Sequence, residues 1–153
     1  MDVKVNAGCL AQASALHQIT SATNEMVEEF CGHVIELLAE FLDDPPSAEK
    51  TNDLENDLFE RLRELGRRLI AWCFGQVEPD DVQDMPGIVS HRGKSHRRMP
   101  DKTLRRDIVT RFGKITLFRA RYRHGRAGRT IFPLEILLGI EDGFTPAAAT
   151  RVG

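Results

Sequence analysis

The sequence has no long apolar run and few cysteines, and these two features limit the class of protein that it can encode. No stretch of the 153 residues approaches the roughly 18–20 consecutive apolar residues that a membrane-spanning helix needs. Residues 1–16 lack the basic start and continuous apolar run of a secretory signal. The cysteines Cys9, Cys31 and Cys73 are odd in number and widely spaced, which argues against a disulfide framework. We therefore expect a cytoplasmic protein that does not contact a membrane.

The charge, by contrast, is sharply segregated along the chain, although the net charge is only −2. Residues 1–87 carry 6 Lys+Arg against 18 Asp+Glu, a net of −12, and residues 88–129 carry 14 against 2, a net of +12. Residues 130–153 carry 1 against 3, a net of −2. Such asymmetry predicts contact with nucleic acid or with an acidic partner. The alternative is that the two halves neutralise each other within one fold.

The acidic half predicts a first amphipathic helix that begins at Asn24. Residues 1–23 are small and polar, and they predict either a loose helix or a disordered arm. From Asn24, a suitable N-cap, apolar residues recur at three- and four-residue steps as far as Leu42. The helix should end at residues 43–46, because a residue before proline is pushed out of the α region.

A second amphipathic helix should begin between Ser47 and Asp53, with Asn52 and Glu55 in a capping arrangement. Its apolar stripe continues as far as Trp72. Two such helices joined by a short turn predict an αα-hairpin over residues 24–77. We expect the two stripes to bury each other, and a homodimer through the same surface is the alternative.

Residues 78–107 predict a linker followed by a basic loop. Residues 78–86 are acidic and contain proline, as linkers often do. Residues 88–100 carry six basic or histidine side chains and only three apolar ones. That composition cannot bury a core alone, so an exposed loop is expected.

A basic β-hairpin is predicted next, from residues 107–112, a turn at Gly113 and Lys114, and a second strand over residues 115–123. Gly113 can adopt the positive φ of a tight turn, but the register stays open. Period-two alternation would place Arg119, Arg121 and Arg123 on one face, opposite Phe118, Ala120 and Tyr122. Successive arginines would lie about 6–7 Å apart, close to the phosphate spacing of a nucleic-acid strand. A solvated face, or pairing with the acidic helices, is the alternative.

The C-terminal part predicts two short helical segments. Pro133 can begin a helical turn that Gly139 ends, and Thr145 followed by Pro146 is a helix-start signal. Few residues follow Pro146 in the sequence, and isolated helices that short are unstable in water. A truncated chain and an ordinary C-terminus both fit this pattern.

Three ordered motifs together resemble a known family. They are LFERLRELGRRLIAW (58–72), RRDIVTRFGKITLFRARYR (105–123) and IFPLEILLGI (131–140). This order is similar to the N-terminal region of ISKra-type insertion-sequence transposases. The hairpin motif is matched by Thr110, Phe112, Gly113, Ile115, Thr116, Arg119 and Tyr122. The next motif is matched by Phe132, Pro133, Leu134, Glu135, Leu138 and Gly139. The resemblance implies a DNA-binding segment that precedes a D,D,E-type catalytic domain.

The chain departs from that family in two ways. Relatives carry cysteine pairs in the manner of a zinc ribbon, whereas no cysteine follows Cys73 here. His91, His96 and His124 remain, but they offer no thiolate and no regular ligand spacing, so we expect no metal and no cofactor. The sequence also ends before the family's catalytic carboxylates, so we expect no enzymatic activity.

The sequence therefore predicts an α+β fold: an αα-hairpin, a basic β-hairpin of zinc-ribbon-like character without its cysteines, and a short C-terminal helical segment. Four regions are expected, over residues 1–23, 24–77, 78–107 and 108–153. The predicted function is the non-catalytic DNA-binding part of a transposase-like protein. A protein-interaction or structural domain is the alternative. The predicted nucleic-acid contacts are Arg97, Arg98, Arg105, Arg106, Arg111, Lys114, Arg119, Arg121 and Arg123.

Overall fold

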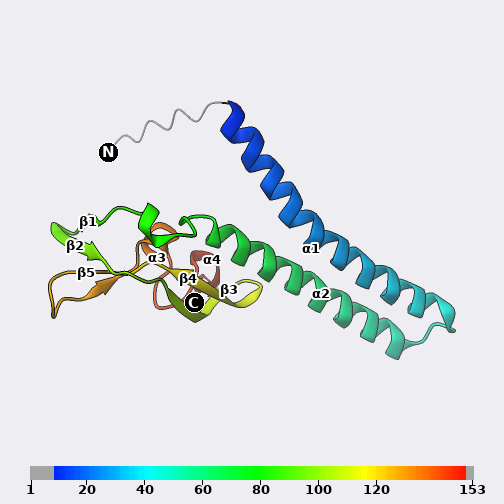
Figure 1. Ribbon diagram of the computed structural model, residues 1–153. Coiled ribbons are helices and arrows are strands. Elements are labelled where there is room, and N and C mark those ends of the chain that lie inside the picture. Colours follow the sequence, from blue (N-terminus) through cyan, green and yellow to red (C-terminus); the bar gives the residue numbers. More distant parts are fainter. Residues whose placement is uncertain (1–8, 151–153) are drawn as a thin grey trace. The chain divides into compact units, whose positions relative to one another are not determined.

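The computed structural model describes the backbone of residues 9–150 and the side chains of residues 17–150 (Figure 1). The fold is mixed α+β, as predicted, with two long helices followed by antiparallel strands and short helices. Contacts divide the chain into two units, Met1–Leu65 and Gly66–Gly153. The boundary between the two units falls inside the second helix. The elements in order are α1 (Cys9–Asp43), α2 (Ala48–Gly75), a 3-10 turn η1 (Val82–Asp84), β1 (Ile88–His91), β2 (Lys94–Arg98), β3 (Thr103–Thr110), β4 (Gly113–Arg119), β5 (Tyr122–Arg123), β6 (Thr130–Ile131), α3 (Pro133–Leu137) and α4 (Pro146–Ala149).

Helix α1 begins 15 residues earlier than predicted. Asn24 lies inside it, so the prediction that Asn24 caps the helix is wrong. Residues 9–23 contain no proline or glycine and several good helix formers, so nothing interrupts the helix. It ends at Asp43, just before the two prolines, as expected. Of the two alternatives predicted for residues 1–23, a loose helix and a disordered arm, the structure shows a helix over residues 9–23, and residues 1–8 lie outside the described residues.

Ser47 caps helix α2. The backbone N–H of Lys50 donates to Ser47 Oγ at 3.2 Å, and that of Thr51 donates to the Ser47 carbonyl at 3.0 Å. The predicted Asn52–Glu55 capping arrangement is wrong, because both residues lie inside the helix. A serine that satisfies a free N–H of the first turn gives the helix its start.

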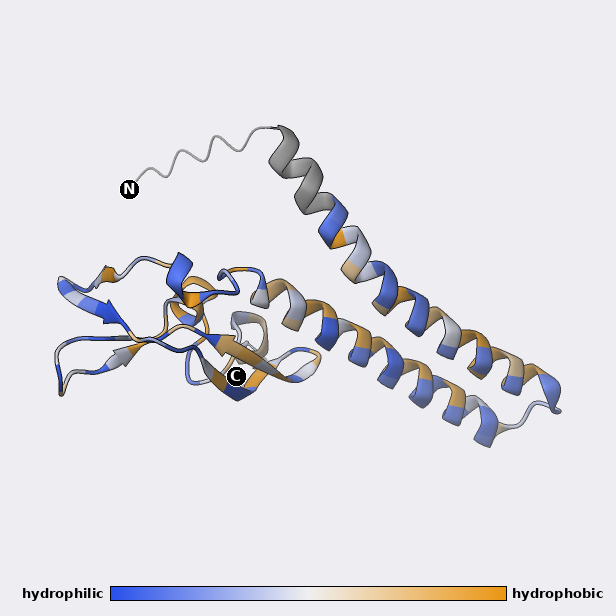
Figure 2. Cartoon of the chain, viewed as in Figure 1, coloured by the Kyte–Doolittle hydropathy of each residue, from blue (hydrophilic) through white to orange (hydrophobic). Residues whose placement is uncertain are grey.

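The apolar stripes of α1 and α2 recur along both helices (Figure 2), but they do not bury each other as predicted. No residue of α2 is buried, and none is buried in α1 from His17 onward. In α1 the exposed fractions of Ile35, Leu38 and Leu42 are 66, 45 and 78%. Each helix therefore keeps part of its stripe in water, because one neighbouring helix cannot cover a face this wide. Among the described helices, none has a stretch long and apolar enough to cross a bilayer.

Residues 88–98 form a β-hairpin, so the prediction of an exposed basic loop there is wrong. Arg92 and Gly93 have φ of 50° and 73°, the pair of positive values that a two-residue type I′ turn requires. Strand β2 also pairs with β5, which gives an antiparallel sheet in the order β1-β2-β5-β6. The hairpin is poor in apolar residues and contributes only Val89 to its core. The other core residues come from elsewhere in the chain: Val82, Ala120 and Tyr122 are buried, and Met85 and Ile131 pack against them.

The predicted basic hairpin is present as β3 and β4, with a different turn. Thr110 pairs with Gly113, so the turn residues are Arg111 and Phe112. Gly113 has φ of 117°, as its predicted role requires, but it is the first residue of β4. A bulge lies between Arg105 and Ile108. A bulge adds one residue to a strand and shifts its alternation.

A second core joins the end of α2 to this hairpin. Ile108, Ile115, Leu117, Leu134 and Ile140 are buried together, with Ile70, Ala71, Phe74 and Leu138 packed against them. A Cβ atom added at Gly66 would lie 2.3 Å from Cδ1 of Phe112, so the ring sits directly on the helix backbone. The C-terminal segment attaches to the same hairpin, because the Val109 N–H donates to the Gly143 carbonyl at 2.7 Å. Both predicted C-terminal helix starts are confirmed, with Pro133 and Pro146 in the first turns of α3 and α4.

Candidate nucleic-acid interface

The strand predicted over residues 115–123 is broken after Arg119. Strand β4 ends there and β5 begins at Tyr122 in the other sheet. The residues between them bond elsewhere: the Ala120 N–H donates to Glu78 Oε2 at 2.8 Å, and the Arg121 carbonyl accepts from the Met99 N–H at 2.9 Å. Alternation therefore does not continue across the break, and the predicted shared face of three arginines is wrong.

Arg119 faces inward, while Phe118 faces solvent. Their exposed fractions are 6% and 63%, the reverse of the prediction. Ile115 and Leu117 of the same strand are buried, so Arg119 follows them onto the inner face by the period of two. Within residues 115–119 the predicted period of two is present, but the buried and exposed sides are exchanged. Which side is buried depends on which residues reach the core.

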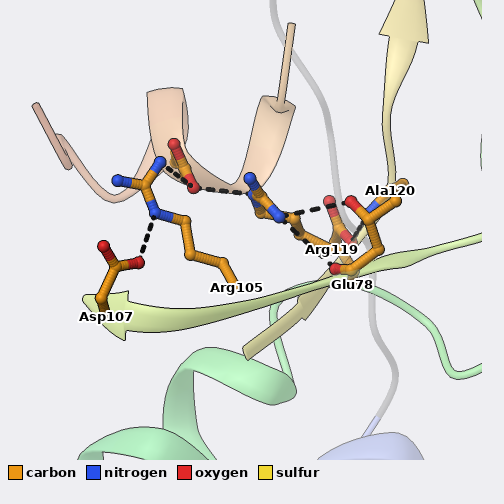
Figure 3. A network of polar contacts seen from close by, with 7 residues as sticks. Glu78, Arg105, Asp107, Arg119 and Ala120 are labelled. Carbon is orange, nitrogen blue, oxygen red and sulfur yellow. Dashed lines mark hydrogen bonds and ion pairs between the residues drawn. The ribbon is translucent and has the colours of Figure 1, made fainter. Parts of the chain in front are cut away.

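The Arg119 guanidinium is held by three groups of the same unit. Its Nε lies 2.7 Å from Glu135 Oε1 in an ion pair, its Nη1 donates to Thr103 Oγ1 at 3.3 Å, and its Cζ lies 3.7 Å from the ring centre of Phe132. Figure 3 shows the polar contacts. Burial lowers the pKa of Arg119, and the charge of Glu135 opposes that shift. An arginine keeps its proton under such shifts, so this is a buried, charged pair.

Arg105 extends the same network (Figure 3). Its Nη1 lies 3.5 Å from Glu135 Oε1 and its Nε lies 3.3 Å from Asp107 Oδ1. The bulge explains how Arg105 and Ile108, three positions apart, can both reach the inner face: each pairs with an inward residue of β4, Leu117 and Ile115. Arg105 is therefore engaged inside the fold.

Arg98 and Arg121 are also unsuited to the predicted role. Arg98 donates from Nη1 to the Gln83 carbonyl at 3.0 Å and from Nη2 to Gln83 Oε1 at 2.7 Å, and it also donates to the Met85 carbonyl. Arg121 is half-buried, with its Nε enclosed and lacking a hydrogen-bond partner. Four of the nine predicted contacts are thus partly or wholly taken up by the fold.

Five of the nine predicted residues remain exposed and make no hydrogen bond or ion pair through their side chains with the part of the chain that the structure describes. Arg97 and Arg123 are register partners on β2 and β5, so they lie side by side on one face of the sheet. The others belong to the β3–β4 hairpin. The five are Arg97, Arg106, Arg111, Lys114 and Arg123.

Four further cations, outside the predicted set, are exposed near the two turns of the β1-β2-β5-β6 sheet. They lie in the same basic stretch, so charge alone could have indicated them, but two of them belong to the segment predicted to be a loop and the other two to a segment without a predicted structure. The four are Arg92, Lys94, Arg126 and Arg129.

The three histidines come together in space, which their sequence spacing did not predict. The ring centres of His91 and His96 are 6.2 Å apart, and those of His96 and His124 are 5.6 Å apart. Even so, no group of three or more His, Cys, Asp or Glu side chains within residues 17–150 is placed to hold a metal ion.

No protein-family model matches this chain, and searches of curated proteins and of solved structures find no similar protein.

Proposed function

We propose that this chain is the non-catalytic DNA-binding N-terminal part of a transposase-like protein. It would bind DNA through the exposed cations of its second unit, Gly66–Gly153, which we call the β-rich unit. The observation that carries the proposal is the pairing of Arg97 with Arg123. The two residues are directly opposite on adjacent strands, and both are exposed.

Like charges directly opposite on neighbouring strands destabilise a sheet. No carboxylate of the described chain forms an ion pair with Arg97 or Arg123, whereas Arg105 forms two ion pairs and Arg119 forms one. A phosphate placed between the two exposed arginines would turn that repulsion into attraction on both sides. An extended polyanion supplies such groups at regular spacing.

The charge of the β-rich unit supports the same partner. Residues 66–153 carry 17 Lys+Arg against 9 Asp+Glu, a net of +8, while residues 1–65 carry 4 against 14, a net of −10. A locally positive unit attracts a polyanion over several ångströms. The ion pairs of Glu135 and Asp107 use two of the unit's arginines and leave the other cations in excess.

The resemblance to transposase N-terminal regions gives further support. Arg119 belongs to the hairpin motif, and Phe132 and Glu135 belong to the motif that follows. The Arg119 side chain contacts both of the others. Because residues of the two motifs pack together, the motifs belong to one folded unit.

The proposal includes a homodimer through the two long helices. Ile35, Leu38 and Leu42 lie three and four positions apart, on one face of α1, and all three are exposed. A second copy of this chain offers the same face, so an isologous contact could cover both stripes. Two copies would also present two basic units to one DNA molecule.

The alternative is a structural or protein-interaction domain in which the basic hairpin is neutralised by acidic groups. The pairing of Arg119 and Arg105 with Glu135 favours it for those two arginines. It does not extend to Arg97 and Arg123, for which no ion pair with the described chain is found. The two readings therefore predict different consequences for the two sets of arginines.

The test compares the binding of labelled duplex DNA by three forms of the chain at low salt. The wild type should retard the duplex. The double variant Arg97→Ala/Arg123→Ala should bind it more weakly, and its melting temperature should not fall, because the repulsion between the two charges is removed. The matched control, Arg61→Ala/Arg63→Ala, removes the same charge from α2 and should bind like the wild type. Absence of any retardation by the wild type would overturn the proposal.

A further inference from the structure

An open pocket of about 430 Å³ lies at one end of the β1-β2-β5-β6 sheet. The two turns of the sheet meet there, because β5 runs antiparallel to β2 and so delivers its loop to the end where the β1–β2 turn lies. We call this the histidine pocket. Its charged or titratable lining side chains are His91, Arg92, Lys94, His96, His124 and Arg129.

The pocket is built from tightly fixed pieces. Arg92 occupies the left-handed region of the type I′ turn. A Cβ atom added at Gly128 would lie 1.6 Å from the His124 carbonyl oxygen, so the β5–β6 loop folds back directly onto His124. His96 is 5% exposed and its ring lies between the other two. The backbone around the three histidines therefore fixes the positions of their rings relative to one another.

The hydrogen bonds of two rings assign their protons. Nδ1 of His96 lies 3.0 Å from the Lys94 carbonyl oxygen, and Nδ1 of His124 lies 2.7 Å from the Ser95 carbonyl oxygen. A carbonyl oxygen only accepts, so each Nδ1 carries the hydrogen. The Nε2 atom of each ring is then the one left for a ligand. It becomes a donor to an anion when the imidazole takes up a second proton.

The charge of the pocket selects an anion. Arg92, Lys94 and Arg129 bring three positive charges to the lining, and no carboxylate lines it. None of the three makes a side-chain hydrogen bond or ion pair with the described residues. Cations gathered without a counter-charge repel one another, and a bound anion removes that cost. A phosphate group offers several acceptor oxygens and suits a set of separate donors.

We propose that the histidine pocket binds a phosphate group, with donors from Arg92, Lys94, Arg129 and the histidine Nε2 atoms. The inference rests on the proposed function only for the source of the phosphate, which would be the DNA backbone. The site itself would also accept inorganic phosphate. The groups that face the ligand are the three histidines and the three fixed cations, and no carboxylate among them opposes an anion.

The test follows the imidazole signals of the five histidines by NMR as inorganic phosphate is added to the full chain. We expect the signals of His91, His96 and His124 to move, while those of His17 and His33 stay. The variant Lys94→Ala/Arg129→Ala, whose residues are exposed, should weaken phosphate binding about tenfold or more. Arg126→Ala, in the same loop but outside the lining, should not.

Parallel titrations with an unlabelled DNA duplex identify the source. Movement of the same three signals with both ligands supports the pocket and identifies the DNA backbone as the source, whereas movement with DNA alone would show that the pocket does not accept a phosphate group by itself and would overturn the proposal. If DNA binds but leaves these signals in place and phosphate has no effect, the pocket proposal fails and the DNA proposal stands. If phosphate moves these signals while no DNA binds, the pocket proposal stands and the DNA proposal fails. Movement with Zn²⁺ but not with phosphate would identify a metal site and overturn the proposal.

Discussion

Arg119 and Glu135 form a buried ion pair, with Nε and Oε1 2.7 Å apart and only 8% and 14% of the two side chains exposed. The pair joins the end of β4 to helix α3, and Phe132 stacks on the guanidinium from the segment before that helix. A buried charge is costly unless it is paired. The position therefore calls for an arginine for reasons of folding, whatever the chain binds.

Replacing Arg119 should lower stability and leave DNA binding of the folded protein largely intact. Arg119→Ala leaves Glu135 partly buried without its nearest partner, and breaking such a pair costs about 3 kcal/mol of unfolding free energy. Chemical denaturation measures it. Arg123→Ala, on the exposed face of β5, is the control and should change stability little. Equal stability of the two variants would contradict the structural role of Arg119.

Gly66 and Phe112 should be energetically coupled. Gly66→Ala would normally stabilise a helix by about 1 kcal/mol, but here the new methyl group meets the Phe112 ring. We expect Gly66→Ala alone to destabilise the protein. In a Phe112→Ala background the same change should become stabilising. A double-mutant cycle from denaturation midpoints measures the coupling, and additive effects would show that the ring does not sit on the helix.

Tyr122 should ionise at a higher pH in the folded protein than in the unfolded chain. Burial raises the pKa of Tyr122, and its hydroxyl donates to the Pro86 carbonyl at 2.7 Å, which favours the neutral form. Because the folded pKa is the higher one, this stability is present below the ordinary value of about 10 and is lost as the pH rises above it. The chain has one tyrosine, so the ultraviolet phenolate band reports this residue alone. A titration that is the same with and without urea would refute the burial.

The apolar face of α1 should mediate self-association. Leu38→Glu/Leu42→Glu places two charges on that face, and both positions are exposed in the single chain, so the monomer's own fold should tolerate them. Light scattering after gel filtration should give a two-chain mass for the wild type and a one-chain mass for the variant. Glu36→Gln is the control on the polar side. A wild-type monomer at micromolar concentration would rule out the dimer.

The fold class, the two long helices and the starts of the short C-terminal helices could be predicted from local signals, because prolines and three-to-four-residue spacing act over a few residues. The end of α1 at Asp43 and the starts of α3 and α4 followed from such signals. The hairpin of residues 88–98 could not be found in this way. Its own residues are too polar to indicate a strand, and it depends on β5 and on Tyr122, about 25–35 positions later.

The candidate site was predicted in composition but not in arrangement. The predicted alternation over residues 115–123 assumed a single strand. At Ala120 the backbone leaves that strand, and its N–H donates to Glu78, 42 positions away in the sequence. Arg119 lies inward because it alternates with the buried Ile115 and Leu117 on β4, whereas Arg123 lies on the exposed side of β5 in the other sheet. The meeting of His91, His96 and His124 likewise results from strand pairing, which no spacing of histidines along the sequence reveals.

The salt dependence of DNA binding tests the central claim most directly. If the five exposed cations Arg97, Arg106, Arg111, Lys114 and Arg123 contact phosphates, the logarithm of the binding constant should fall with that of the salt concentration at a slope of about −4 to −5. Removing Arg97 and Arg123 together should make the slope shallower by about 2. Binding that ignores salt, or a slope that these two substitutions leave unchanged, would contradict the account.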